Sequence, residues 1–142
     1  MNPTLEKFGY PATLVAELEH WAILLRREQV TLGSLVLAAK GDATRYSELT
    51  SEAFTEQGEA VRRIERALAA FVAFEKINYL MLMMVDPNPH FHVIPRYSAP
   101  RTWGGTEFPD AGWPKAPRLD AAVTLDDAQV AGLVAEISDN FR

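Results

Sequence analysis

The stretch of sequence that decides the fold is Asn88-Pro89-His90-Phe91-His92-Val93-Ile94-Pro95-Arg96. Its alternation of polar and apolar residues predicts a β-strand from His90 to Tyr97. Because residues i and i+2 of a strand point to the same face, we expect His90 and His92 to stand side by side, about 7 Å apart. Phe91 between them should then point to the opposite face, into the core.

Two imidazoles on one strand face are suited to chemistry at phosphorus. Imidazole transfers protons near neutral pH and is also a nucleophile. A nucleophilic ring needs an acceptor on one nitrogen so that the other nitrogen keeps its lone pair. A second imidazole beside it can bind phosphate oxygens or protonate a leaving group. We therefore predict that His90 and His92 are catalytic residues.

The stretch resembles the signature of the histidine triad (HIT) superfamily, which is His-x-His-x-His, then two apolar residues, then usually Pro-Arg. The resemblance implies that His90 is the nucleophile and that His92 binds phosphate and assists the leaving group. Asn88 stands where the first histidine is expected, so the triad is incomplete. In the family this first position offers its backbone carbonyl to the ring of the nucleophile, and Asn88 keeps that carbonyl.

The rest of the chain predicts an α+β, HIT-like fold with an antiparallel sheet of about five strands, one long helix and a C-terminal helix. A single domain should span residues 1–142. The expected elements before the histidines are a short helix at Ala12–Leu18, a hairpin of strands at Trp21–Leu25 and Ser34–Ala39, a long helix from Thr50 or Ser51 to about Phe74, and a strand at Ile77–Val85. The last of these has apolar residues at both odd and even positions, which indicates a central strand buried on two faces.

The chain changes character after the histidine strand. Residues 98–122 are rich in proline and tryptophan, and we expect an extended segment over the core with Trp103 and Trp113 as anchors. Thr124 is a suitable N-cap for a final helix over residues 124–140. The resemblance to the HIT superfamily covers roughly Trp21 to Tyr97, so it does not include this tail.

Four polar residues are candidates for binding the substrate. Asn88 precedes the histidines, and Asn78 lies on the preceding strand, where a hydrogen bond at the strand end is the alternative. Arg26 falls near a position that is often acidic or an amide in the HIT family, and an arginine there favours phosphate over ribose hydroxyls. Ser34 follows Gly33 at a position where the family commonly has histidine.

The composition excludes several classes of protein. Of 142 residues, 48% are hydrophobic and none is cysteine, so disulfides and thiolate chemistry are excluded. The net charge of −5 argues against a nucleic-acid partner. No apolar run is long enough to cross a bilayer, and the first residues carry acid and proline rather than a signal-peptide pattern. We expect a cytoplasmic protein without a membrane partner.

Three functions remain open from the sequence. The leading one is a nucleotide hydrolase or nucleotidyl transferase that acts on a nucleoside phosphate or dinucleoside polyphosphate through a covalent nucleotidyl-His90 intermediate. It would be an enzyme of the HIT type, cleaving a phosphoric anhydride or phosphoramidate, with no cofactor and no metal. The alternatives are a non-catalytic nucleotide-binding module and a metal site that uses His90, His92 and Asp86. HIT proteins are commonly homodimers, so the resemblance also implies a homodimer.

Overall fold

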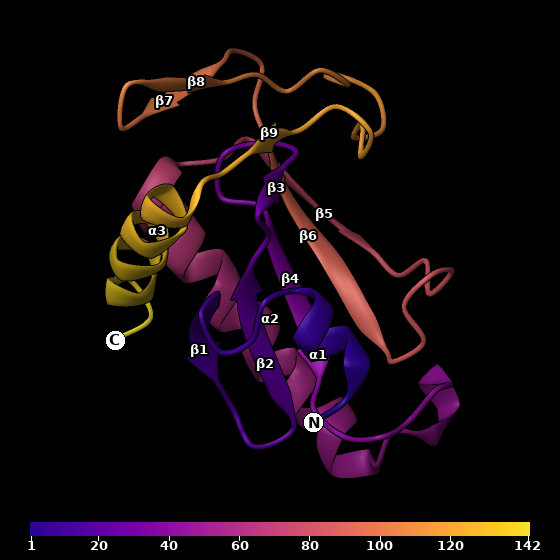
Figure 1. Cartoon of the computed structure of the whole chain (residues 1–142). Coiled ribbons are helices and arrows are strands. Elements are labelled where there is room, and N and C mark those ends of the chain that lie inside the picture. The colour runs from indigo at the N-terminus through magenta and orange to yellow at the C-terminus, as the bar shows by residue number, and fades with distance from the viewer.

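The computed structural model describes all residues from 1 to 142 (Figure 1). The sequence forms three α-helices, nine strands and one short 3-10 helix. In chain order they are α1 (Pro3–Lys7), β1 (Leu14–Glu17), β2 (Trp21–Leu25), β3 (Glu28–Gln29), β4 (Leu35–Ala39), the 3-10 helix η1 (Tyr46–Glu48), α2 (Ser51–Val72), β5 (Lys76–Leu80), β6 (His90–Arg96), β7 (Arg101–Trp103), β8 (Thr106–Phe108), β9 (Val123–Thr124) and α3 (Asp127–Asp139). None of the helices has both the length and the apolar character needed to cross a membrane.

The main sheet is antiparallel and has the strand order β1-β2-β4-β6-β5. The predicted α+β class with a five-stranded sheet, a long helix and a C-terminal helix is therefore confirmed. The hairpin of β2 and β4 is confirmed as well, and β5 pairs with β6 in antiparallel register. Strand β6 has hydrogen-bonded neighbours on both sides, so its side chains are held in a fixed register.

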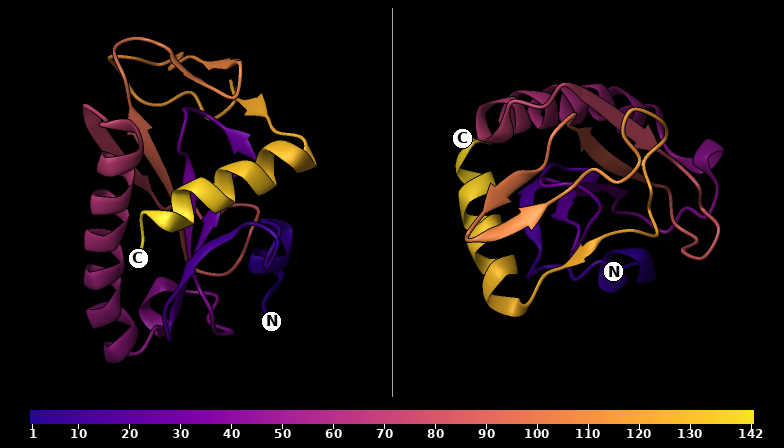
Figure 2. Two further views of the ribbon diagram at one scale, coloured as in Figure 1. Left: turned by 90° about the vertical axis from the view of Figure 1, so that its left-hand side faces the viewer. Right: turned by 90° about the horizontal axis from the view of Figure 1, so that it is seen from above.

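The two faces of the sheet carry different layers. Helix α2 runs along one face, and α3 packs against α2 and the first two strands, as the side and top views show (Figure 2). The short α1 lies on the opposite face (Figure 2, right). Every residue of β2 and β4 is buried, because both of their faces are covered. Thr50 caps α2 as predicted, since its side chain accepts a hydrogen bond from the Ala53 N–H.

The first part of the chain differs from the prediction. The helix predicted at Ala12–Leu18 is wrong: residues 14–17 form the edge strand β1, and the helix is α1, at Pro3–Lys7. The apolar spacing that favoured a helix is met equally by a strand interrupted by a bulge. The signal for α1 is local, because Asn2 caps it and Pro3 occupies its first turn.

Strand β5 was also predicted wrongly in part. It ends at Leu80 instead of Val85, and it lies at the edge of the sheet instead of its centre. The apolar residues that follow leave the sheet, and Met84 and Val85 are 86% and 81% exposed. An apolar run satisfies a two-sided strand and an exposed apolar loop equally well, so the pattern alone could not separate them.

The proline- and tryptophan-rich segment forms the hairpin of β7 and β8 above one end of the sheet (Figure 1). Its deepest residue is Phe108, which is fully buried, while Trp103 packs on the core from its periphery and Trp113 lies outside both apolar clusters. Thr124 is not the N-cap of α3. Its side chain binds Glu28 across the β3–β9 pair, and Asp126 caps the helix in a capping box with Gln129.

A buried ion pair fastens this segment to β6. Arg96 donates to both carboxylate oxygens of Asp110, at 2.7 and 3.0 Å, and both side chains are at most 5% exposed. The same carboxylate accepts the backbone N–H of Tyr97 at 3.1 Å, and the third donor of Arg96 binds Asn78 at 2.8 Å. The buried polar atoms of the guanidinium and the carboxylate thus all have hydrogen-bond partners within the protein.

We expect Asp110→Asn to lower the free energy of unfolding by about 3–5 kcal/mol, because it leaves the Arg96 charge buried without its counter-ion. Equilibrium denaturation in urea measures this. The matched control is Asp120→Asn, which breaks the exposed Arg118–Asp120 pair and should leave the free energy of unfolding nearly unchanged. Equal losses in the two variants would contradict the assigned role of Asp110.

Candidate active site

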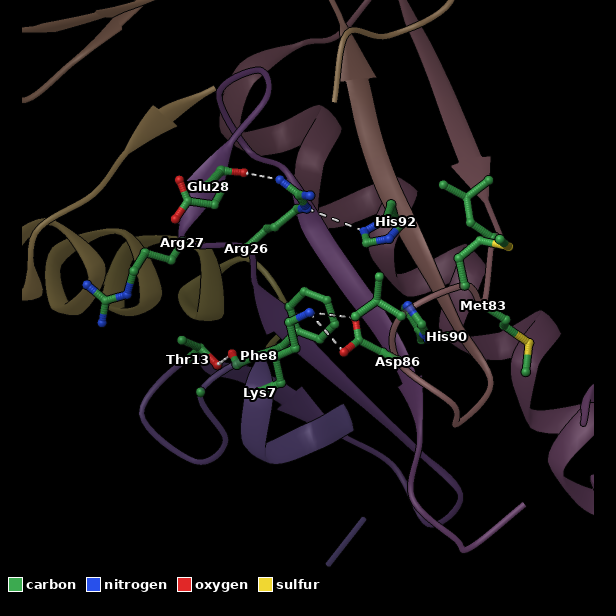
Figure 3. A pocket seen from close by; sticks show the side chains of 14 residues that line it. Lys7, Phe8, Thr13, Arg26, Arg27, Glu28, Met83, Asp86, His90 and His92 are labelled. Carbon is green, nitrogen blue, oxygen red and sulfur yellow. Dashed lines mark hydrogen bonds and ion pairs between the residues drawn. The ribbon is translucent and has the colours of Figure 1, made fainter. Parts of the chain in front are cut away.

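A pocket of about 400 Å³ lies over the sheet face that carries the two histidines. Strand β6 supplies its floor, α1 and the following turn supply one wall, the residues after β2 supply a second, and the apolar loop after β5 supplies a third (Figure 3). The lining residues are Lys7, Phe8, Gly9, Thr13, Arg26, Arg27, Glu28, Leu82, Met83, Met84, Val85, Asp86, His90 and His92.

His90 and His92 project from the same face of β6, as the alternation predicted. Their ring centroids are 5.2 Å apart and their planes are nearly perpendicular, at 85°. Both side chains are largely buried, yet both line the pocket. The ring of Phe8 packs against both imidazoles, with centroid separations of 5.6 and 5.9 Å, and limits their movement.

The ring of His90 is oriented by a backbone carbonyl. Its Nδ1 lies 2.7 Å from the carbonyl oxygen of Asn88. A carbonyl oxygen only accepts hydrogen bonds, so Nδ1 carries a proton, and in the neutral ring Nε2 keeps a lone pair. His90 therefore has the tautomer that a nucleophile requires. This is the interaction that the resemblance to HIT proteins implied for position 88.

The ring of His92 is oriented the other way round. The Nε–H of Arg26 donates to its Nδ1 over 3.3 Å, so Nδ1 is the acceptor and Nε2 carries the proton of the neutral ring. Burial, reinforced by the positive charge of Arg26, lowers the pKa of His92 to about 4. At neutral pH the pocket thus holds one imidazole with a free lone pair and one that is a hydrogen-bond donor.

The four predicted substrate-binding residues are not all at the pocket. Arg26 lines it, beside His92 (Figure 3). Asn88 is buried and turned to the N-terminal segment, where its side chain accepts from the Thr4 hydroxyl at 2.9 Å and donates to the Ala43 carbonyl. Ser34 is fully buried in the turn before β4 and exchanges hydrogen bonds with Thr31. Asn78 lies outside the pocket and binds Arg96.

Several pocket residues escaped the sequence reasoning. Lys7 forms an ion pair with Asp86 over 3.0 Å, and together with Phe8 it enters the pocket at the end of α1. The Asn2-Pro3 pair is a capping signal that could have revealed α1, but nothing local indicates that α1 folds back over β6. The apolar loop after β5 was mistaken for strand.

The structure does not gather His90, His92 and Asp86 as metal ligands. The one group of histidine and carboxylate side chains whose ligand atoms all lie within 4.8 Å of one another is Glu19, His20 and Glu56, at the surface far along the chain from the histidine pair. Asp86 is instead engaged by Lys7. The alternative of a metal site at the histidine pair is therefore not supported by a third ligand close to the two imidazoles.

No protein-family model matches the sequence, and no curated protein matches it significantly. Among solved structures, a histidine triad protein from Bradyrhizobium japonicum is 17% identical and superimposes with a TM-score of 0.70 over 100% of this chain and 97% of its own. A histidine triad protein from Sinorhizobium meliloti is 22% identical, with a TM-score of 0.69 over 99% of this chain and 95% of its own. The diadenosine triphosphate hydrolase of Plasmodium falciparum, solved with cyclomarin A, is 9% identical, with a TM-score of 0.69 over 91% of this chain and 76% of its own.

The chain therefore has the fold of the histidine triad superfamily, and the predicted resemblance is confirmed at the level of the fold. The likeness is wider than predicted. It was expected to end near Tyr97, but the match to the Bradyrhizobium structure covers the whole chain, including β7 to α3.

The low pKa of His92 predicts how stability depends on pH. Between its ordinary value of 6.5 and about 4, the unfolded chain binds a proton at His92 that the folded chain does not. Folding stability should therefore fall as the pH drops from 6.5 to 4, and part of this loss should vanish in His92→Gln. Urea denaturation across this range tests it, and identical pH profiles for the two proteins would contradict it.

Proposed function

We propose that the protein is a HIT-type hydrolase or nucleotidyl transferase that acts on a nucleoside phosphate or dinucleoside polyphosphate. The observation that carries the proposal is the pair of complementary tautomers: the Asn88 carbonyl leaves Nε2 of His90 free to attack, and Arg26 leaves Nε2–H of His92 free to donate. The Plasmodium neighbour is a diadenosine triphosphate hydrolase, and its substrate belongs to this class.

In the proposed reaction, Nε2 of His90 attacks the α-phosphorus and a phosphorus–nitrogen bond forms while the bond to the leaving group breaks. The leaving group departs with the electron pair. The positive charge that develops on the His90 ring is stabilised by its Nδ1–H bond to the Asn88 carbonyl. Water then attacks the same phosphorus and the phosphorus–nitrogen bond breaks. The electron pair of that bond returns to Nε2, and the proton of the water passes to solvent.

The role of His92 in this scheme is to donate a hydrogen bond to a phosphate oxygen. Phosphate oxygens gain negative charge in the transition state, and a preorganised donor in a half-closed pocket stabilises that charge without reorientation. The cations Lys7, Arg26 and Arg27 outnumber the carboxylates Glu28 and Asp86 around the pocket, although the chain as a whole carries −5. This local excess favours an anionic ligand.

The alternative function is a nucleotide-binding module without catalysis. The observation in its favour is Asn88, whose side chain is committed to Thr4 and Ala43 and cannot act on a substrate as an imidazole would. The two functions differ in whether His90 becomes covalently modified.

We expect radiolabelled nucleotide to be trapped on the protein after denaturation at alkaline pH, where a phosphorus–nitrogen bond survives, and the label to be absent from His90→Ala. A control variant, His20→Ala, removes a histidine remote from the pocket and should keep the label. Nucleotide that binds to the wild type but never labels it, with affinity unchanged in His90→Asn, would instead establish the non-catalytic module.

We further propose a homodimer, as the resemblance implied. Strand β5 is an edge strand with one free side, and the loop after it exposes Leu82, Met84 and Val85. An open edge beside an apolar patch favours association with a second copy. Light scattering after size exclusion should give twice the 15.8 kDa chain mass, and Met84→Glu should shift the mass toward the monomer. A monomer mass for the wild type at all concentrations would contradict the dimer.

A further inference from the structure

Arg26 is held in the pocket by two acceptors that carry no negative charge. Its Nε–H donates to Nδ1 of His92 at 3.3 Å, and its Nη1 donates to the backbone carbonyl of Glu28 at 2.7 Å (Figure 3). Its Nη2 donates to no protein atom, and no buried side-chain nitrogen or oxygen lacks a partner, so Nη2 opens to solvent. A half-buried guanidinium thus presents unused donors within the pocket.

The other two cations of the pocket are already paired. Lys7 is 3.0 Å from Asp86, and Arg27 is 3.0 Å from Asp127 while also donating to the Leu125 carbonyl. Arg26 has no carboxylate within ion-pair distance. An unpaired charge that is partly removed from water is costly unless a ligand supplies the counter-ion. Arg26 is therefore the one cation of the pocket without an ion pair, and the Glu28 carboxylate acts on its charge only from beyond ion-pair distance.

The bond from Arg26 also limits what His92 can do. With Nδ1 facing an N–H donor, His92 carries its only proton on Nε2, and releasing that proton would leave an imidazolate. His92 can therefore hydrogen-bond to a phosphate but is poorly suited to protonate a leaving group. A reaction at this site needs a leaving group that departs as a stabilised anion, and phosphate is such a group whereas an amine is not.

The sheet register places Arg26 next to the reacting position. Leu24, Val36 and His92 stand opposite one another on adjacent strands, and Ala38 stands opposite His90. Arg26 follows Leu24 by two residues along the direction of β2. Its backbone therefore lies two residues beyond the level of His92 in the sheet, on the side away from His90. A phosphoryl group between the two imidazoles would therefore have the Arg26 backbone on its His92 side, away from His90.

We propose that Arg26 forms a subsite for a second phosphate, the leaving phosphate of a phosphoric anhydride, and thereby selects anhydrides over phosphoramidates. This inference rests on the proposed function. The anhydride P–O bond breaks as His90 Nε2 bonds to the α-phosphorus, and the departing phosphate keeps the electron pair. The Arg26 guanidinium neutralises its charge, so no proton from His92 is needed.

Binding of two inorganic probes tests the subsite without any turnover. Calorimetry should show that the intact chain binds pyrophosphate about tenfold more tightly than phosphate, which is the increment expected from one charge-assisted contact. Arg26→Gln should abolish this preference. Arg66→Gln is the control, since it removes the same charge from an exposed residue of α2 outside the pocket, and the preference should survive it.

The reaction provides the second arm. Formation of labelled His90 from a dinucleoside triphosphate should slow at least about tenfold in Arg26→Gln, and the rate with a nucleoside phosphoramidate should change much less. Circular dichroism checks that the variant is folded. Equal binding of the two probes by the wild type, or a pyrophosphate preference that persists in Arg26→Gln, overturns the subsite.

The two proposals fail in different ways. If His90 is labelled but Arg26→Gln slows both classes of substrate equally, the subsite is wrong and the proposed function stands. If pyrophosphate is preferred through Arg26 but His90 is never labelled, the pocket binds two phosphates and the covalent mechanism is wrong.

Discussion

The pleat of β6 is the constraint on which the site depends. Because this strand is hydrogen-bonded to β4 on one side and β5 on the other, neither its register nor the direction of its side chains can change without breaking the sheet. One face of the strand contributes Val93 to the core under α2. The other face holds His90 and His92 toward the pocket. A slip of one residue would bury the imidazoles in the apolar core.

Asn88 shows how a triad position can change while the chemistry keeps its orientation. Its backbone carbonyl orients His90, and a residue of any type at position 88 offers this carbonyl. Its side chain has a structural role, because it hydrogen-bonds both to Thr4 in α1 and to the Ala43 carbonyl. Helix α1 in turn delivers Lys7 and Phe8 to the pocket. The asparagine thus links the orientation of the nucleophile to one wall of the site.

The sequence predicted the features that are set by local periodicity and capping. The strand hairpin before the long helix, the start of that helix near Thr50 and the shared face of the two histidines all follow from such rules. The failures have one physical origin, because short apolar segments fit more than one structure. Leu14–Glu17 fits a helix or a strand, and residues 81–85 fit a buried strand or an exposed loop. Only tertiary packing decides between them.

The candidate site was predictable where it lies on one strand and not where it is assembled from distant segments. His90 and His92 are two residues apart, and their geometry follows from the pleat. Asn78 and Ser34 were placed at the site by resemblance alone, and the structure turns both away from the pocket. Arg26, predicted from the sequence to bind the substrate, lines the pocket. Its bond to His92 spans 66 positions of the chain, so no local pattern could have revealed it.

The account rests on two imidazoles whose ring nitrogens are oriented oppositely, one by the Asn88 carbonyl and the other by Arg26. Long-range nitrogen–proton NMR correlation spectra of the histidine rings at neutral pH observe this directly, because they distinguish protonated from unprotonated ring nitrogens. We predict that His90 carries its proton on Nδ1 and that His92 carries its proton on Nε2. A doubly protonated His92, or a His90 ring with its proton on Nε2, would contradict the account.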